Sequence, residues 1–393
     1  MAKKIITKRN VKKAAKAYSQ SSLFVKILIA FILIVAVVGG GLYYYFFIYK
    51  PSNAPAIVKG DLSIHFLELG NEYCGDCIYI KAGDTDILVD GGSRPNSIGT
   101  IQNYIKDYIT DGIIEYAIVT HADQDHIACW AGSNSSQSLF DLYKVNTIID
   151  FPLTNKDTNT YNRYVLKRDA EIENDGAVHY TALECYNNQN GAQRTYTLSD
   201  GISLQILNNY YYSNNSSDEN NFSVCFMINQ GSNHYLFTGD LEEAGEKKLV
   251  ELNDLPEVTL FKAGHHGSGT SNTEELLSVI KPQYIAITCV AGSVEYSKRL
   301  DNVFPYQVTV DKISKYTDNV LVTSCIDMVN TGEKDSKGYD IYSNEEKITR
   351  SLNGTIIFTC TDGEITFTGT NNSTKFKDSD WFHSYRQTPA NWQ

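Results

Sequence analysis

Three polar motifs, each placed directly after an apolar run, restrict the fold more than any other feature of this sequence. They are His-Ala-Asp-Gln-Asp-His at 121–126, Thr-Gly-Asp at 238–240 and Gly-His-His-Gly-Ser at 264–268. The apolar runs before them have the length and composition of buried strands. We therefore expect the chemistry of the chain at positions where strands end.

The first motif indicates metal binding. Two imidazoles and two carboxylates fall within six residues, and such groups can converge on a metal ion from a single turn. Chance would assemble this pattern in a chain with eight histidines on the order of once in a thousand sequences. Four of the eight histidines lie in the two motifs that contain histidine. A solvated polar turn is the alternative interpretation.

The order of apolar runs predicts an α/β domain. Strands are expected at 62–69, 77–81, 86–89, 113–120, 202–207, 224–228, 235–237, 258–262 and 284–288, helices at 98–108, 242–252 and 274–280, and loops at 155–190 and 208–221. Asn272 is expected to cap the last of these helices. Strands that first meander and then alternate with helices favour a mixed sheet covered by helices.

A basic and apolar segment precedes this domain. Residues 27–49 are 23 uncharged, mostly apolar residues, enough to cross a hydrocarbon core of about 30 Å as a helix. Residues 1–50 hold nine Lys/Arg and no Asp or Glu, so the positive-inside rule places the N-terminus in the cytoplasm and the domain outside the cell. A cleaved secretory signal is the alternative, and it would also export the domain.

The expected organisation is a basic cytoplasmic tail at 1–26, a transmembrane helix at 27–49, a linker at 50–59, a globular domain at 60–372 and a polar tail at 373–393. Residues 51–393 carry 25 Lys/Arg against 46 Asp/Glu, a formal charge of −21. Nucleic-acid binding normally rests on the neutralisation of phosphates by Lys and Arg. No extended nucleic-acid-binding surface is therefore expected.

Cysteine usage leaves disulfide pairing open. The chain holds eight cysteines, and those of an exported domain can pair. Cys225 and Cys289 fall inside apolar, strand-like runs, where a free buried thiol is the simpler interpretation.

The polar motifs follow one another in an order that resembles a known superfamily. Phe-Leu-Glu-Leu-Gly at 66–70, Leu-Val-Asp-Gly-Gly at 88–92 and Glu-Asn-Asn-Phe-Ser at 219–223 accompany the three strand-end motifs. With them the sequence resembles the metallo-β-lactamase fold superfamily, and more narrowly the metallo-hydrolase domain of the competence protein ComEC and its stand-alone relatives. The resemblance implies an α/β (α+β) sandwich of the αββα type, here preceded by one transmembrane helix, with a metal site at one edge of the two sheets.

The resemblance also implies a set of metal ligands. They are His121, Asp123, Asp125, His126, Asp240, and His265 or its neighbour His266. His121 and Asp123 would hold one ion and the other ligands a second, with Asp240 bridging both. Asp90 would brace the ligand turn through hydrogen bonds.

The number and kind of ions stay open. The superfamily motif more often has histidine where this chain has Asp123, and a carboxylate shifts the preference a little from Zn²⁺ toward Mn²⁺. The histidine expected before the Thr-Gly-Asp strand has no clear counterpart, and His179 is the candidate for an additional ligand. One or two divalent ions are therefore expected.

The implied function is a metal-dependent phosphodiesterase or nuclease at the cell surface. A divalent ion lowers the pKa of a bound water toward about 7. Asp125 would orient that water, and whichever of His265 and His266 does not bind metal would stabilise or protonate the leaving oxygen. The charge of the domain favours a small phosphodiester or a cell-surface polymer as substrate. Hydrolysis of a carbon ester or amide, and a binding protein on a degenerate hydrolase scaffold, are the alternatives.

Overall fold

The computed structural model describes residues 23, 26–28, 31, 35, 60–344 and 348–393. The chain divides into two compact units, Met1–Ala56 and Ile57–Gln393. Among the residues described, no helix has the length and apolar character needed to span a membrane. The cytoplasmic tail, the transmembrane helix at 27–49 and the linker lie for the most part outside the described residues, so they stay predictions.

Two mixed, eight-stranded sheets form the centre of the unit Ile57–Gln393. Sheet A contains, in spatial order, β18 (Glu364–Gly369), β17 (Ile356–Thr361), β1 (Asp61–Phe66), β2 (Ile78–Ala82), β3 (Thr85–Val89), β4 (Ile113–Ile118), β5 (Lys144–Asp150) and β6 (Val178–Thr181). Sheet B contains β16 (Arg350–Ser351), β13 (Val320–Cys325), β12 (Tyr284–Ala291), β11 (Leu260–Lys262), β10 (Asn233–Phe237), β9 (Phe226–Gln230), β8 (Ile202–Ile206) and β7 (Thr195–Ser199). A separate hairpin is formed by β14 (Val329–Lys334) and β15 (Asp340–Ser343).

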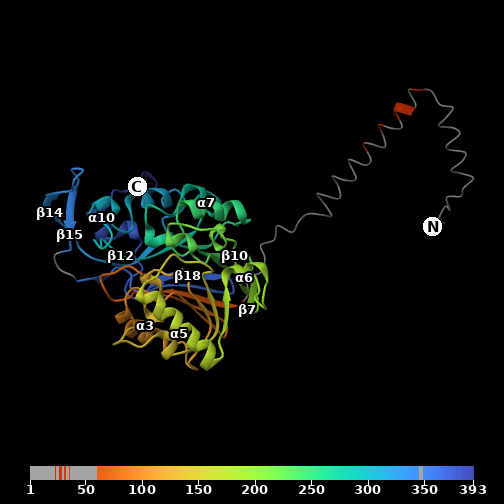
Figure 1. Ribbon diagram of the computed structural model, residues 1–393. Coiled ribbons are helices and arrows are strands. Elements are labelled where there is room, and N and C mark those ends of the chain that lie inside the picture. The colour runs from red at the N-terminus through yellow and green to blue at the C-terminus, as the bar shows by residue number, and fades with distance from the viewer. Residues whose placement is uncertain (1–22, 24–25, 29–30, 32–34, 36–59, 345–347) are drawn as a thin grey trace, which may run out of the picture. The chain divides into compact units, whose positions relative to one another are not determined.

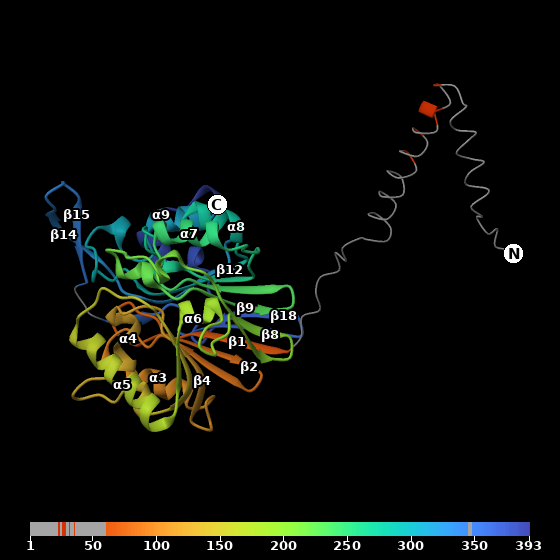
Figure 2. The same cartoon turned by 45° about the vertical axis from the view of Figure 1, so that its right-hand side comes forward.

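Helices cover the outer face of each sheet, so the unit has four layers (Figures 1 and 2). The helices beside sheet A are α3 (Ile98–Ile105), α4 (Gln124–Ala131) and α5 (Asn159–Asp175). Those beside sheet B are α7 (Glu243–Leu252), α8 (Glu274–Ile280), α9 (Gln307–Ile313) and α10 (Asp380–Tyr385). The short helix α6 (Ala182–Asn187) follows β6. This arrangement is the expected αββα sandwich.

Apolar side chains fill the space between the layers. The rings of Phe226 and Phe237 in sheet B stack 4.6 Å apart, and Phe66 of sheet A lies 6.3 Å from Phe237. A second apolar cluster joins sheet B to its outer helices. Strands such as β12 are apolar on both faces because each face is covered. Cys225 and Cys289 are buried free thiols, as predicted.

Parallel strand pairing determines where the polar motifs lie. Strands β3 to β6 run parallel to one another, and so do β10 to β13. The first motif follows β4, the second follows β10 and the third follows β11. In such sheets the crevice outside the carboxyl ends of parallel strands is the usual place for a ligand. The strands and helices expected from sequence are present, with ends that differ by a few residues.

The loop predicted at 155–190 is wrong. That stretch contains α5, β6 and α6. Helix α5 lacks the repeating apolar positions of an amphipathic helix, because polar contacts attach it to the rest of the domain. Glu171 accepts a hydrogen bond from the Val145 amide, and the Tyr164 hydroxyl donates to Asp150. The Thr158 side chain caps its first turn by accepting from the Tyr161 amide. A helix anchored by such contacts shows little of the periodicity on which the sequence argument depends.

Two further expectations need correction. Residues 373–393 are not a free polar tail, because Trp381, Phe382 and Trp392 are buried in the cluster beside sheet B. The cap of α8 is Thr273, whose side chain accepts from the Leu276 amide, and not Asn272. The Asn272 side chain instead exchanges two hydrogen bonds with the backbone of Gly264, each 2.9 Å long, and so holds the third motif in place.

Candidate metal centre

The turn after β4 supplies four of the predicted ligands. His121 is fully buried just beyond the strand, and Asp123 is the first residue before α4. Asp125 and His126 lie in the first turn of that helix, where both are largely buried. The sequence folds in this way because the apolar strand ends at Ile118 and the helix starts at Gln124, which leaves a short connection lined with polar groups.

Sheet B supplies the remaining ligands. Gly239 has a φ of +54°, and a Cβ atom there would approach the Ser223 hydroxyl to 2.8 Å, so the turn that presents Asp240 requires glycine. The third motif forms a single 3₁₀ turn, η6 (Gly264–Gly267), in which His265 and His266 both have positive φ. These backbone conformations direct the two imidazoles differently, since His266 is buried and His265 is partly exposed.

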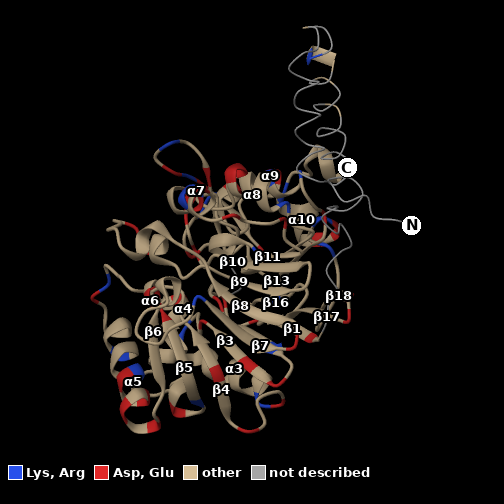
Figure 3. Cartoon of the chain, turned by 90° about the vertical axis from the view of Figure 1, so that its right-hand side faces the viewer, with Lys and Arg blue, Asp and Glu red and all other residues tan. Residues whose placement is uncertain are grey.

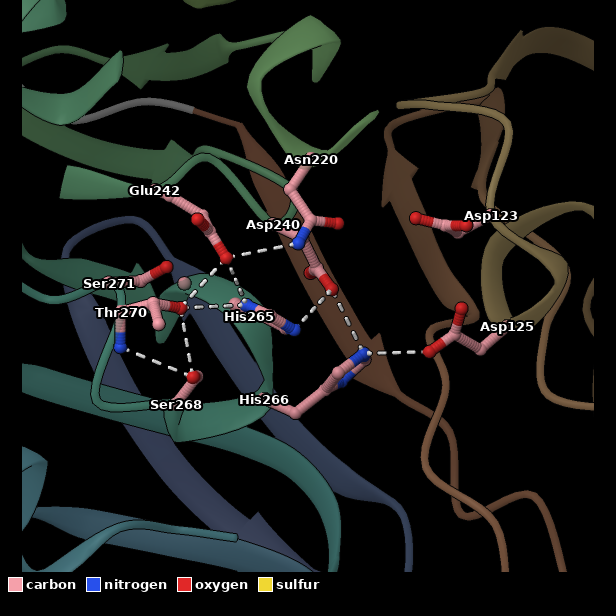
Figure 4. A network of polar contacts seen from close by, with 12 residues as sticks. Asp123, Asp125, Asn220, Asp240, Glu242, His265, His266, Ser268, Thr270 and Ser271 are labelled. Atoms are coloured by element: carbon pink, nitrogen blue, oxygen red, sulfur yellow. Dashed lines mark hydrogen bonds and ion pairs between the residues drawn. The ribbon is translucent and has the colours of Figure 1, made fainter. Parts of the chain in front are cut away.

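Four side chains from the three motifs converge on one point. Candidate ligand atoms of Asp125, His126, Asp240 and His266 all lie within 4.8 Å of one another. The Nε2 atoms of His126 and His266 are each 3.2 Å from Oδ2 of Asp240, and His266 Nε2 is 3.6 Å from Asp125 Oδ2. Figure 4 shows Asp125, His266 and Asp240 turned toward one another from separate elements.

The donor set fits a divalent cation. The buried Nε2 atoms of His121, His126 and His266 have no hydrogen-bond partner within the described part of the chain. A buried polar atom without a partner is costly, and a metal ion is the partner that accepts imidazole nitrogen and carboxylate oxygen together. Asp125, His126, Asp240 and His266 are therefore the residues that would hold it.

Hydrogen bonds orient two of the imidazoles. His126 Nδ1 lies 2.8 Å from Asp90 Oδ2, and His266 Nδ1 lies 2.8 Å from the carbonyl oxygen of Thr288. With Nδ1 donating to each acceptor, Nε2 is the nitrogen placed to bind an ion. Burial lowers the pKa of both imidazoles, but nearby carboxylates, Asp240 foremost, raise it well above its usual range, so an ion would displace the Nε2 proton. Asp90 also accepts from the amide and hydroxyl of Thr120, at 2.7 and 2.8 Å. It therefore lies where a brace for the ligand turn was predicted.

A buried ion pair lies behind the ligands. Lys262 Nζ is 2.5 Å from Asp76 Oδ2 and 3.5 Å from Asp240 Oδ1, and all three side chains are buried. Burial lowers the pKa of the Lys262 amine, but Asp76 and Asp240 raise it more, so the ammonium stays charged. Asp76 was missed from the sequence. A single aspartate between Gly75 and Cys77 does not indicate which distant side chain it pairs with.

His265 lies at the rim of the cluster. Its Nε2 is 3.9 Å from Asp240 Oδ2, and its Nδ1 is 3.2 Å from the Thr270 hydroxyl and 3.4 Å from Glu242 Oε1. Glu242 also accepts hydrogen bonds from Asn220 and Thr270 (Figure 4). His266 belongs to the converging group and His265 does not. The structure thus separates two neighbours that the sequence left equivalent.

The first predicted metal position is less complete. His121 Nε2 is 3.6 Å from Asp123 Oδ2, and the His121 ring lies 4.1 Å from that of His126. His179 does not contribute, because its Nε2 bonds Asp150 at 2.8 Å, beside Arg168. No other histidine among the described residues takes the place of the missing ligand, and His121 and Asp123 lie outside the converging group.

The electrostatics of the site favour metal-binding forms of two side chains. Burial lowers the pKa of His121 to about 4, with His126 adding to the effect, so its imidazole is neutral near pH 7. Burial raises the pKa of Asp125, but the hydrogen bond with His266 and the charges of His126 and His266 lower it well below its usual range. Asp125 therefore stays ionised.

Tyr296 is a further residue that sequence reasoning missed. Its hydroxyl donates a 3.1 Å hydrogen bond to Asp125 Oδ2, and its ring packs 5.6 Å from that of Phe304. Phe304 in turn lies 5.9 Å from the His266 ring. Because Tyr296 is more than half exposed, it forms part of the opening of the site. One tyrosine among 27 in the chain carries no signal of this role.

Comparison with known proteins gives partial matches. No family model matches the chain. Over 102 residues it is 29% identical to Recombination protein 2 of Haemophilus influenzae, a match that covers 26% of this chain and 12% of that protein. Over 105 residues it is 28% identical to ComE operon protein 3 of Bacillus subtilis, with 27% and 13% covered. The matched segment thus spans about an eighth of the length of these curated relatives.

Among solved structures, the metallo-β-lactamase fold protein YhfI from Bacillus subtilis aligns over 72% of this chain and 100% of its own. The identity is 10% and the TM-score 0.39. The ordered motifs, the two-sheet sandwich and the two curated matches agree with one another. They confirm that this chain resembles the metallo-β-lactamase fold superfamily of metal-dependent hydrolases, and in particular its ComEC-like members.

Proposed function

We propose that the protein is a divalent-metal-dependent hydrolase of small phosphodiesters. The observation that carries this proposal is the set of unpartnered, buried Nε2 atoms facing carboxylates of Asp125 and Asp240. A divalent ion at this point would polarise a phosphoryl oxygen and acidify a water molecule. The charge match between a cationic centre and an anionic diester favours phosphorus over carbon as the point of attack.

The residues around the centre have complementary tasks. Asp125 Oδ2 accepts from Tyr296, and its carboxylate can accept a proton or hold a water molecule beside the substrate. The Tyr296 hydroxyl, at the opening of the site, can donate to a substrate oxygen only in place of this bond to Asp125. His265, partly exposed and hydrogen-bonded near Glu242 and Thr270, is placed to donate a proton to the leaving oxygen. Lys262 is buried in its ion pairs and does not contact substrate.

We further propose that the domain works outside the cell, anchored by residues 27–49 with the N-terminus in the cytoplasm. The apolar run and the basic flank of the sequence support this proposal. The substrate would then be a small diester or a phosphodiester of a cell-surface polymer. A protease added to intact cells should remove the domain and spare the N-terminal tail. Protection of the domain would contradict the proposed topology.

The experiment is a substrate panel with purified protein. Bis-p-nitrophenyl phosphate, a p-nitrophenyl carboxylic ester and an anilide are tested after removal of metal and after addition of Zn²⁺ or Mn²⁺. We expect hydrolysis of the diester that depends on added metal. Turnover of the ester or anilide alone would favour the carbon hydrolase. Metal binding without any turnover would favour a binding protein.

A further inference from the structure

A lysine takes the place beside Asp123 where the first metal ion was predicted. Lys156 Nζ lies 2.5 Å from Asp123 Oδ1, and the two side chains are similarly half-buried, at 29% and 28% exposed. The opposite oxygen, Oδ2, faces His121 Nε2 at 3.6 Å. The ammonium therefore already neutralises the carboxylate that would have to bind the ion.

A buried carboxylate holds this lysine in position. Glu219 accepts hydrogen bonds from the amide of Ala122 at 3.0 Å, the amide of Asn155 at 2.9 Å and the hydroxyl of Thr154 at 2.8 Å. Ala122 belongs to the ligand turn, whereas Thr154 and Asn155 directly precede Lys156. One side chain thus ties the lysine-bearing segment to the metal-binding turn, and the ion pair is more than a chance contact of a surface lysine.

The remaining donors of the first position are few. Besides Asp123 they are His121 and a share of Asp240, which already faces His126 and His266. An ammonium beside a divalent cation would add like-charge repulsion in a partly buried site. At the second position the described ammonium is Lys262, whose Nζ pairs with Asp76 at 2.5 Å and lies farther, 3.5 Å, from Asp240 Oδ1, while the other oxygen, Oδ2, faces His126 and His266.

We propose that this centre holds one divalent ion, bound by Asp125, His126, Asp240 and His266, and that the Lys156 ammonium replaces the first metal ion. Lys156 then supplies the second positive charge toward an anionic substrate oxygen. This proposal rests on the proposed function in one respect, which is that the centre binds a metal ion. The role of Lys156 determines the number of metal ions per chain, so it can be tested without any substrate.

The test compares the wild type with Lys156→Met and Lys156→Arg. After loading with excess Mn²⁺ and gel filtration, metal per chain is measured by plasma mass spectrometry and spin coupling by electron paramagnetic resonance. We expect one uncoupled ion in the wild type and in Lys156→Arg. Lys156→Met has a side chain of similar length without the charge. It should bind close to two ions per chain and give an exchange-coupled spectrum. Retention in Lys156→Met of the ion held by Asp125, His126, Asp240 and His266 shows that the variant is folded.

Two coupled ions in the wild type would overturn the proposal. One ion in Lys156→Met, under the loading that saturates the wild type, would overturn it as well, because the lysine would then not exclude the other ion. Kinetics give an independent arm. Lys156→Met assayed at one ion per chain should raise KM for bis-p-nitrophenyl phosphate several-fold, and Lys156→Arg should restore it. Failure of all phosphodiester turnover would contradict the proposed function and leave the stoichiometry result standing.

Discussion

Each imidazole in the metal centre depends on the partner of its far nitrogen. Asp90 accepts from His126, and the Thr288 carbonyl accepts from His266, both at 2.8 Å. The Asp90 carboxylate is fully engaged, since its other contacts are the amide and hydroxyl of Thr120. Its backbone has a φ of +55°, a conformation that few residues other than glycine adopt readily. The position of this side chain is therefore closely specified by its surroundings.

Asp90→Asn should weaken metal binding without unfolding the protein. In the asparagine side chain an NH₂ group replaces one carboxylate oxygen. Either His126 or Thr120 then loses the oxygen that accepts its hydrogen bond. Loss of such a supporting contact costs about 10- to 100-fold in metal affinity. A competition titration against a chromophoric chelator measures the change. Asp86→Asn, in β3 just before Asp90 but bonded to Tyr79 and Lys81, is the matched control and should bind metal as the wild type does.

Single residues also show what the sequence could and could not predict about the site. The positions of Asp125, His126 and Asp240 followed from motifs that end strands, because strand ends bring such motifs together. The choice of His266 over His265 depends on two positive-φ residues and on a carbonyl in β12. Asp76 and Lys156 each act through a partner distant in sequence. A local pattern contains no such pairing.

At the scale of elements, prediction succeeded where burial produces periodicity. The expected strands, β12 among them, pack against covered faces, so their positions could be read from sequence, whereas β5, β13 and the half-exposed edge strands β7 and β18 were not predicted. In α5 hydrophilic residues predominate, and polar anchors hold it through Glu171 and Tyr164. In α10, two large aromatic residues provide most of the burial within a polar stretch. Neither element has a repeating pattern that could separate it from a loop.

Trp381→Ala should destabilise the whole domain and not only its C-terminal segment. The indole is buried beside Phe376, and its Nε1 donates to the Ile326 carbonyl at 3.0 Å. Truncation of a buried tryptophan costs about 3–5 kcal/mol. Urea denaturation followed by circular dichroism measures the free energy of unfolding. His383→Ala, exposed on the same helix, should change it little. An unchanged midpoint for Trp381→Ala would mean that this segment is a tail.

At the scale of the whole molecule, the net negative charge of the domain opposes the attraction of a metal-loaded centre for anionic substrates. Residues 51–393 have a formal charge of −21. In the view of Figure 3, Lys and Arg are scattered among Asp and Glu along the ribbon of the outer helices and loops. A short diester experiences mainly the site, whereas a long duplex also experiences the surrounding acidic surface.

Hydrolysis of long DNA should therefore be slow at low salt and improve as salt rises to about 0.1 M, where the Debye length falls to about 10 Å. A small diester should show little change over the same range. Initial rates on both substrates, measured at matched metal concentration, test this expectation. A nuclease with a basic groove would instead lose affinity steeply with salt. Duplex cleavage that is fastest at the lowest salt would contradict the charge argument.

The four converging residues Asp125, His126, Asp240 and His266 are proposed to hold a divalent ion together. Metal content of the purified protein, wild type against His266→Ala and His265→Ala, tests it most directly. These neighbours share one turn, but the His266 imidazole alone belongs to the converging group. We expect His266→Ala to lose the ion and His265→Ala, with the same fold by circular dichroism, to retain it. Equal metal content in wild type and His266→Ala would contradict this ligand assignment.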